Sequence, residues 1–127
     1  MKIPFALYLT AISVLVLPAD AHHSFAAEFD SMKPVTLTGT VTKVDWANPH
    51  ARLYLDVKEE SGKTTVWTFE LLNPNVLLRE GWTRNTIQPG SVVTVNGFRA
   101  KNGLPFAVVK DVTLSDGRQV LGPRGLK

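Results

Sequence analysis

The chain has 127 residues, with 14 Lys and Arg, 11 Asp and Glu, three His and no Cys, and its net charge is +3. This length suits one small domain, and the apolar fraction of 44% with a charged fraction of 20% is typical of a globular chain. The absence of Cys excludes a disulfide framework, a thiolate zinc site, a cysteine nucleophile and a lipoprotein anchor. The small net charge does not demand a nucleic-acid partner.

The first 21 residues have the layout of a secretory signal peptide. Lys2 provides a positive start, residues 3–17 are almost wholly apolar, and a small-x-small cleavage site ends at Ala21. The apolar run of about 15 residues is short for a membrane span, which needs roughly 20. We therefore predict a periplasmic or secreted protein with no membrane span after cleavage. An uncleaved N-terminal anchor is the alternative.

The rest of the chain, from His22 onward, predicts five short strands. Alternation of apolar and polar residues indicates strands over 35–41, 51–57, 65–71, 92–98 and 106–114. A change of phase after Val41 predicts a β-bulge near Thr42-Lys43. Between the third and fourth strands, Asn73-Pro74 favours the start of a short helix and Gly81 its end.

Three strands, a short helix and two further strands make up the element order of an OB-fold. We therefore predict an all-β, five-stranded OB-like barrel over residues 35–120. An N-terminal arm (22–34) precedes the barrel, and a loose C-terminal tail (121–127) follows it. Ligands usually meet such barrels at the loops after the first and fourth strands, which here are residues 47–50 and 100–105.

The three histidines are the strongest chemical signal in the sequence. Cleavage after Ala21 makes His22 the first residue, and its α-amine and Nδ1 can chelate a metal ion together. His23 follows it, and His50 lies on the loop after the first strand. Nitrogen-rich, tetragonal coordination favours Cu(II) or Ni(II) over Mg²⁺ or Ca²⁺. We therefore predict a copper or other divalent-metal site at His22, His23 and His50, if the arm folds back.

Plainer interpretations of these residues stay open. A His-His pair behind a cleavage site is often a solvated chain end, and a His after Pro is often a turn residue. Glu70 or Asp45 could orient a histidine, although Glu70 could equally be a cross-strand partner of Arg52 or Lys58.

A basic and aromatic stretch near the fourth-to-fifth strand hairpin suggests a second kind of ligand. It contains Arg99, Lys101 and Lys110 with Phe98 and Phe106, a pattern that barrels use to bind single strands. Export separates the protein from nucleic acid, and a basic edge also discourages strand-to-strand aggregation. We therefore expect no nucleic-acid partner.

The sequence contains no paired-carboxylate site, Ser-His-Asp arrangement or glycine-rich phosphate loop. We therefore expect no catalytic residues and a non-enzymatic binding protein. The alternative is a structural module without metal that binds a periplasmic protein or a glycan.

Several short motifs occur together in the chain. They are His22-His23-Ser24-Phe25, Phe29-Asp30, Asn48-Pro49-His50, Gly81-Trp82 and Pro89-Gly90. In this combination the sequence resembles a family of small secreted bacterial proteins of unknown function, over residues 22 to about 120. The resemblance implies a periplasmic β-barrel with a signal peptide and implies no activity.

Overall fold

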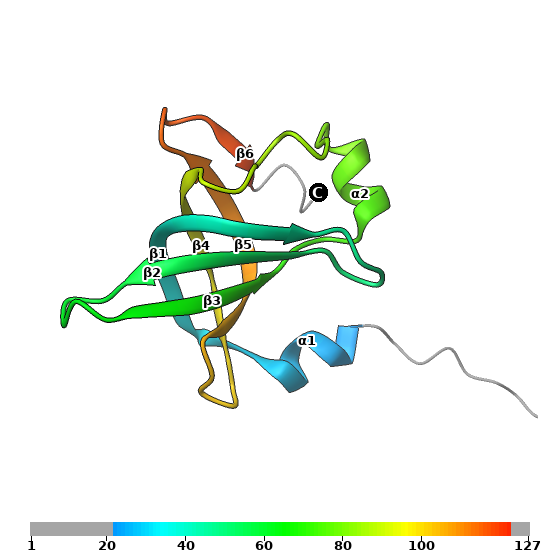
Figure 1. The fold of residues 1–127 in the computed structure, drawn as a ribbon. Helices are drawn as coiled ribbons and strands as arrows, with labels where there is room; N and C mark the ends of the chain where they lie inside the picture. The colour runs from blue at the N-terminus through cyan, green and yellow to red at the C-terminus, as the bar shows by residue number, and fades with distance from the viewer. Residues whose placement is uncertain (1–21, 123–127) are drawn as a thin grey trace, which may run out of the picture.

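The computed structural model describes residues 22–122 (Figure 1). The predicted signal peptide, residues 1–21, and residues 123–127 of the predicted tail lie outside the described residues. The elements in chain order are α1 (His22–Glu28), β1 (Phe29–Asp45), β2 (Arg52–Lys58), β3 (Thr64–Glu70), α2 (Pro74–Arg79), β4 (Val92–Ala100), β5 (Phe106–Leu114) and β6 (Gln119–Leu121). No helix within residues 22–122 is long and apolar enough to cross a membrane.

The strands form one sheet that closes on itself. Their order is β3-β2-β1-β4-β5-β6, and a parallel pairing of β3 with β5 closes the first five strands into a barrel. All the other pairings are antiparallel. Five strands closed in this order, with a helix between β3 and β4, are the OB-like barrel that the sequence predicts.

The barrel interior is filled by the side chains that the alternation pattern assigns to one face. The apolar residues of β2 and β3, which pair antiparallel with each other, are almost fully buried, and they include Leu53, Leu55, Trp67 and Phe69. Their outward neighbours, such as Tyr54 and Thr68, are only partly buried. The predicted strand faces are therefore confirmed, because the residues expected on the core face are the buried ones. An assignment wrong by one residue would have placed these apolar side chains on the solvent face.

The long first strand serves two neighbours. β1 pairs with β4 over its first part and with β2 over its second, so it curves around the barrel (Figure 1). Its register with β2 shifts between Val41 and Lys43, which confirms the predicted bulge. The strand begins at Phe29, six residues before the predicted start at Val35. Residues 30–33, of which only Met32 is apolar, hid this extension, because they break the alternation where the register with β4 also shifts.

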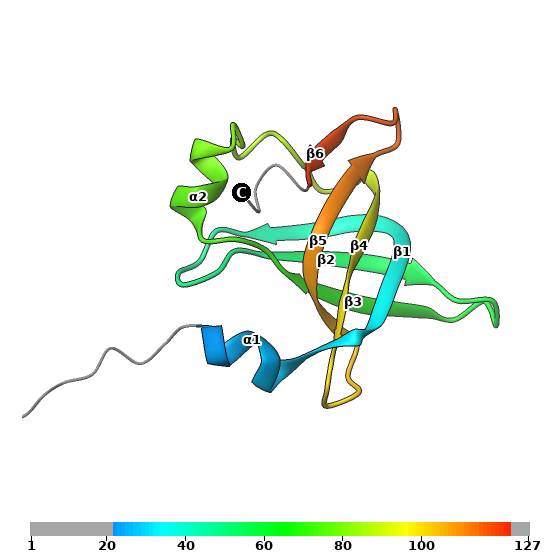
Figure 2. The same ribbon diagram turned by 180° about the vertical axis from the view of Figure 1, so that it is seen from behind.

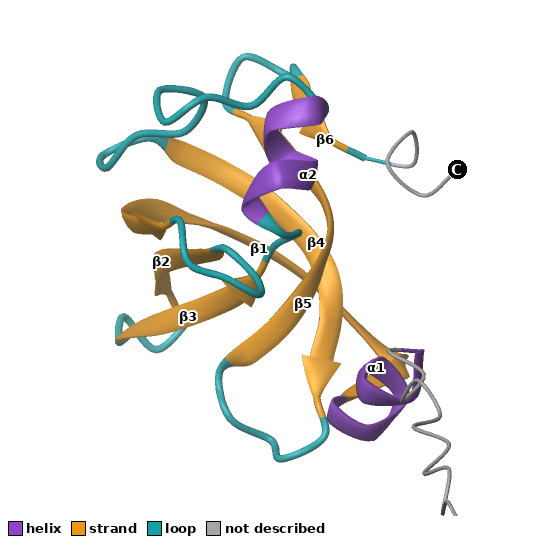
Figure 3. Cartoon of the chain, turned by 90° about the vertical axis from the view of Figure 1, so that its right-hand side faces the viewer, coloured by secondary structure: helices purple, strands orange, loops and turns teal. Residues whose placement is uncertain are grey.

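The two helices lie at different ends of the barrel (Figures 2 and 3). α2 begins as predicted, because the Asn73 side chain accepts a hydrogen bond from the Asn75 amide at 2.9 Å and Pro74 occupies the first turn. Gly81 has φ of 90°, the conformation that ends a helix. Leu77 anchors α2 in the core.

A short strand ends the part of the chain that the structure describes. Residues 119–121 form β6, which pairs with β5, and Leu121 is buried. The Trp82 indole N–H donates to the Val120 carbonyl at 2.7 Å. Of the predicted tail (121–127), Leu121 therefore belongs to a strand, and this strand brings the Val120 carbonyl to the buried Trp82 indole, which needs an acceptor.

Candidate functional site

The loop between β1 and β2 carries His50. Its last residue, Ala51, is fully buried and exchanges two backbone hydrogen bonds with the segment after β3: its N–H donates to the Leu72 carbonyl, and its carbonyl accepts from the Leu71 N–H. The loop also contains a cis peptide bond between Asn48 and Pro49. His50 itself projects outward, and 48% of its side chain is exposed. The loop therefore presents an accessible imidazole from a tethered backbone.

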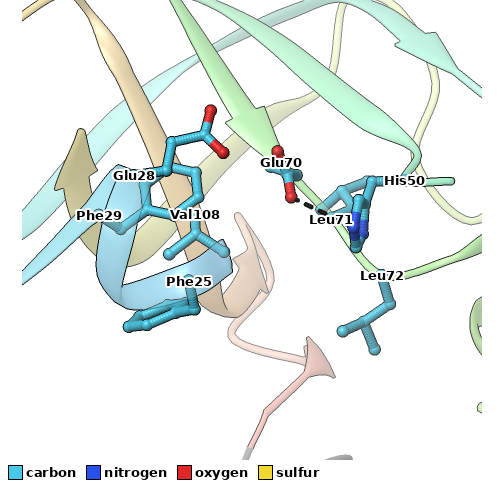
Figure 4. Close-up of a pocket in the computed structure, with 8 residues that line it drawn as sticks. All are labelled: Phe25, Glu28, Phe29, His50, Glu70, Leu71, Leu72 and Val108. Carbon is cyan, nitrogen blue, oxygen red and sulfur yellow. Dashed lines mark ion pairs between the residues drawn. The ribbon is translucent and has the colours of Figure 1, made fainter. Parts of the chain in front are cut away.

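Glu70, at the end of β3, is the acidic partner of His50. Its Oε1 lies 3.5 Å from His50 Nε2, and only 14% of its side chain is exposed (Figure 4). Burial raises the pKa of the Glu70 carboxyl; His50 acts against this rise, Glu28 adds to it, and Arg52 lowers it. Arg52 faces Glu70 in the strand register but forms no ion pair with it. The structure contains both interpretations of Glu70: it is the cross-strand neighbour of Arg52, and its carboxylate lies beside His50.

Asp45, the other carboxylate considered as a partner for His50, ends β1. It faces Arg52 in the register with β2. Within residues 22–122 it forms no ion pair.

The helix α1 is held against the barrel by aromatic side chains. The Phe25 ring lies 5.7 Å from Phe29 and 6.3 Å, edge-on, from Phe98, and Phe29 lies 5.3 Å from Phe106. Phe29 is buried, with 3% exposed. Offset and edge-on aromatic pairs of this kind are favourable beyond their buried area. The N-terminal segment therefore folds back onto the barrel.

The hairpin between β4 and β5 also holds α1. The Lys101 backbone N–H donates to the Glu28 carbonyl at 2.9 Å, and its ammonium group donates to the Ala26 carbonyl. A cation at the C-terminal end of a helix satisfies free carbonyls and opposes the negative end of the helix dipole.

A cavity lies between α1 and the barrel. It has a volume of about 190 Å³. Its lining residues come from α1, the start of β1, the His50 loop, the end of β3 and β5, and they are Phe25, Glu28, Phe29, His50, Glu70, Leu71, Leu72 and Val108 (Figure 4). The walls are mainly apolar, and the polar groups are two carboxylates and one imidazole. The cavity therefore brings α1 and His50 to one site.

Of the three predicted metal ligands, only the side chain of His50 is described. His50 lines the cavity. His22 and His23 open α1, the helix that supplies Phe25 and Glu28 to the same cavity, but their side chains lie outside the described residues. Among the described side chains, no group of three or more His, Asp or Glu could hold a metal ion. Convergence of the three imidazoles therefore stays a prediction.

The basic and aromatic residues near the β4–β5 hairpin have structural contacts. Phe98 and Phe106 belong to the aromatic cluster under α1, and Lys101 binds the end of that helix. The Arg99 guanidinium lies 5.3 Å from the Trp67 ring centre and donates to the Gly103 carbonyl. Lys110 is exposed. The aromatic rings that suggested stacking with bases are therefore engaged within the protein.

Sequence reasoning missed three residues of this region. Phe25 and Glu28 line the cavity, and Asn73 hydrogen-bonds to the loop that carries His50. Helical spacing gave no signal for Phe25, because Phe25 lies in α1 whereas Phe29, the ring it contacts, is the first residue of β1. No local signal indicated that Asn73 would contact a loop 24 residues earlier.

The strand order and this cavity define the protein as a small OB-like barrel with a candidate binding site under its N-terminal helix. Residues 11–108 match a family of unknown function (DUF6152), and the chain belongs to that family. The comparison with curated proteins finds no match.

Two solved structures are similar in fold, both crystal structures of mitochondrial single-stranded DNA binding proteins from S. cerevisiae (Rim1, forms 1 and 2). They share 14% and 17% sequence identity with this chain, with TM-scores of 0.47 and 0.45. Each comparison covers 68% of this chain and 93% of the other.

Proposed function

We propose that this protein is an exported, non-enzymatic binding protein that holds a divalent metal ion, with Cu(II) favoured, through His22, His23 and His50. In this proposal it works in the periplasm or outside the cell without a nucleic-acid partner. The export follows from the signal-peptide layout of residues 1–21.

The contact between His50 and Glu70 is the observation that carries the proposal. A histidine that binds a metal ion usually donates its other ring N–H to a carboxylate, which orients the ring and makes it a stronger ligand. Glu70 faces Nε2 at 3.5 Å. This arrangement leaves Nδ1 as the nitrogen for the metal ion, on a ring that is half exposed.

The position of α1 supports the proposed contribution of His22 and His23 to the site. Phe25 and Glu28 share the cavity with His50, so the helix that begins with His22 and His23 lies beside the His50 loop. Cleavage after Ala21 would give His22 a free amine, which adds a further nitrogen ligand. With no Cys in the chain, thiolate ligands are excluded, and the proposed nitrogen-rich set favours Cu(II) or Ni(II) over Mg²⁺ or Ca²⁺.

The test begins with the exported protein, whose mass establishes the first residue. Cu(II) titration then compares wild type with His22→Ala, His23→Ala and His50→Ala. Lys58→Ala is the control, because Lys58 is exposed at the other end of β2. We expect loss of His22 or His50 to weaken binding by more than the roughly 10–100-fold that loss of an outer-shell partner costs. Equal affinity in wild type, His22→Ala and His50→Ala would contradict the proposal and favour a metal-free module that binds a protein or a glycan.

A further inference from the structure

We propose that Asn73 is a positioning residue for this metal site, because its side-chain amide holds the loop that carries His50. The inference rests on the proposed function and adds a residue outside the proposed ligand set. Asn73 lies between β3 and α2, and its side chain connects the start of α2 to the loop between β1 and β2.

The contacts of Asn73 reach the peptide bond that precedes His50. Its Nδ2 donates to the Pro49 carbonyl at 3.2 Å and to the Asn48 Oδ1 at 3.2 Å. Among the described side chains, which are those of residues 25–122, these are the hydrogen bonds made to residues 46–51. On the other side of His50, the backbone of Ala51 is bonded to the segment after β3. Hydrogen bonds therefore hold both neighbours of His50, with Asn73 bonded to Pro49 and the segment after β3 bonded to Ala51.

The orientation of the Asn73 amide is itself determined by the helix. Its Oδ1 accepts from the Asn75 N–H at 2.9 Å as the N-cap of α2, so the amide nitrogen faces the loop. The Asn73 carbonyl accepts from the Leu77 N–H at 3.0 Å, and Leu77 is fully buried. The loop is thereby tied through one side chain to the hydrophobic core.

This tie has a consequence for ligand binding. A loop that must be ordered when the ligand binds loses affinity through the entropy of ordering. The His50 side chain is half exposed and its Nε2 lies 3.5 Å from Glu70, so the position of its backbone decides which directions are open to the ring. Holding that backbone before the metal ion arrives raises affinity without adding a ligand.

Asn73→Asp separates the two roles of the side chain. Asp caps a helix as well as Asn does, so the acceptor for the Asn75 N–H remains. The carboxylate cannot donate to Asn48 or Pro49. Asn75→Asp is the matched control, because it adds the same charge to an exposed position two residues away. Asn73→Ser is a second variant, which keeps a capping oxygen, adds no charge and lacks the amide donor.

The measurements are Cu(II) affinity, the electron paramagnetic resonance spectrum of bound copper and the thermal midpoint of each variant. We expect Asn73→Asp to bind Cu(II) about 10-fold more weakly than Asn75→Asp, as for other outer-shell losses. We also expect a broadened copper spectrum and a thermal midpoint close to that of the control. Equal affinity and equal spectra in the two Asp variants, and wild-type affinity in Asn73→Ser, would overturn the inference.

A further measurement distinguishes failure of the inference from failure of the proposed function. In metal-free protein, the ring signals of His50 in nuclear magnetic resonance spectra report whether the loop has one conformation. We expect sharp signals in wild type and Asn75→Asp, and broadened or doubled signals in Asn73→Asp. If wild type binds no Cu(II), the proposed function fails, and unchanged His50 ring signals in Asn73→Asp would overturn the positioning role as well.

Discussion

Replacing Glu70 with Gln tests whether the buried carboxylate acts on His50. Gln has nearly the same shape but no negative charge, so the change removes the electrostatic contribution and leaves the packing in place. Loss of an outer-shell carboxylate lowers metal affinity by about 10–100-fold. The distance of 3.5 Å and the half-exposed ring of His50 place this pair at the lower end of that range. We therefore expect Cu(II) to bind about 10-fold more weakly at neutral pH, which corresponds to about 1.4 kcal/mol.

The same variant has a predicted effect on stability. Burial raises the pKa of Glu70, so the folded state holds its proton to a higher pH than the unfolded state does. Linkage then makes the Glu70 contribution to the free energy of unfolding fall as pH rises from the usual carboxyl pKa to the raised one. Glu70→Gln lacks this titration. As pH rises from the usual carboxyl pKa to the raised pKa of Glu70, the free energy of unfolding of the metal-free variant should therefore fall less than that of metal-free wild type.

Isothermal titration with Cu(II) measures the affinity, and urea unfolding between pH 4 and neutral pH measures the stability. Glu60→Gln is the control, because Glu60 is exposed in the β2–β3 hairpin. If Glu70→Gln and Glu60→Gln bind Cu(II) equally well, Glu70 does not act on the metal site. A Glu70→Gln stability profile parallel to that of wild type would refute the argument from burial.

Three further predictions concern the packing that positions the site. Phe29→Ala should lower the free energy of unfolding by about 3 kcal/mol, because a buried ring is lost from the cluster under α1, and thermal unfolding should show a midpoint more than about 10 °C lower. Lys101→Met should cost about 1 kcal/mol through loss of the bond to Ala26, and amide exchange should quicken in α1 while the barrel stays protected. Gly97→Ala should destabilise the fold by about 1–3 kcal/mol or more, because its Cβ would lie 2.2 Å from the Val108 carbonyl oxygen; an unchanged urea midpoint would contradict that.

The barrel could be predicted because its signals are local. The alternation in residues 51–57 and 65–71, the phase change after Val41 and the Asn73-Pro74 helix start each act over a few residues. The placement of His50 and Glu70 at one end of the β2–β3 hairpin also follows from antiparallel pairing once those strands are assigned.

The docking of α1 could not be predicted in the same way. Phe25 contacts Phe98, which is 73 residues later, and Lys101 binds a helix that ends at Glu28. Such contacts depend on barrel closure, which brings the start of β1 beside the end of β4. Residues 30–33 have no alternation and lie in the irregular stretch between the β4 pairings of Phe29 and Pro34, so no local pattern showed that the strand begins at Phe29.

By itself, the sequence determined the fold class, the faces of the strands and the exclusion of thiolate ligands from any metal site, because periodicity and composition are properties of the chain. Tertiary structure alone decided that α1 shares a cavity with His50, that Glu70 rather than Asp45 is the partner of the imidazole, and that Asn73 holds the loop. These contacts join segments far apart in sequence, and their distances exist only after the barrel has closed.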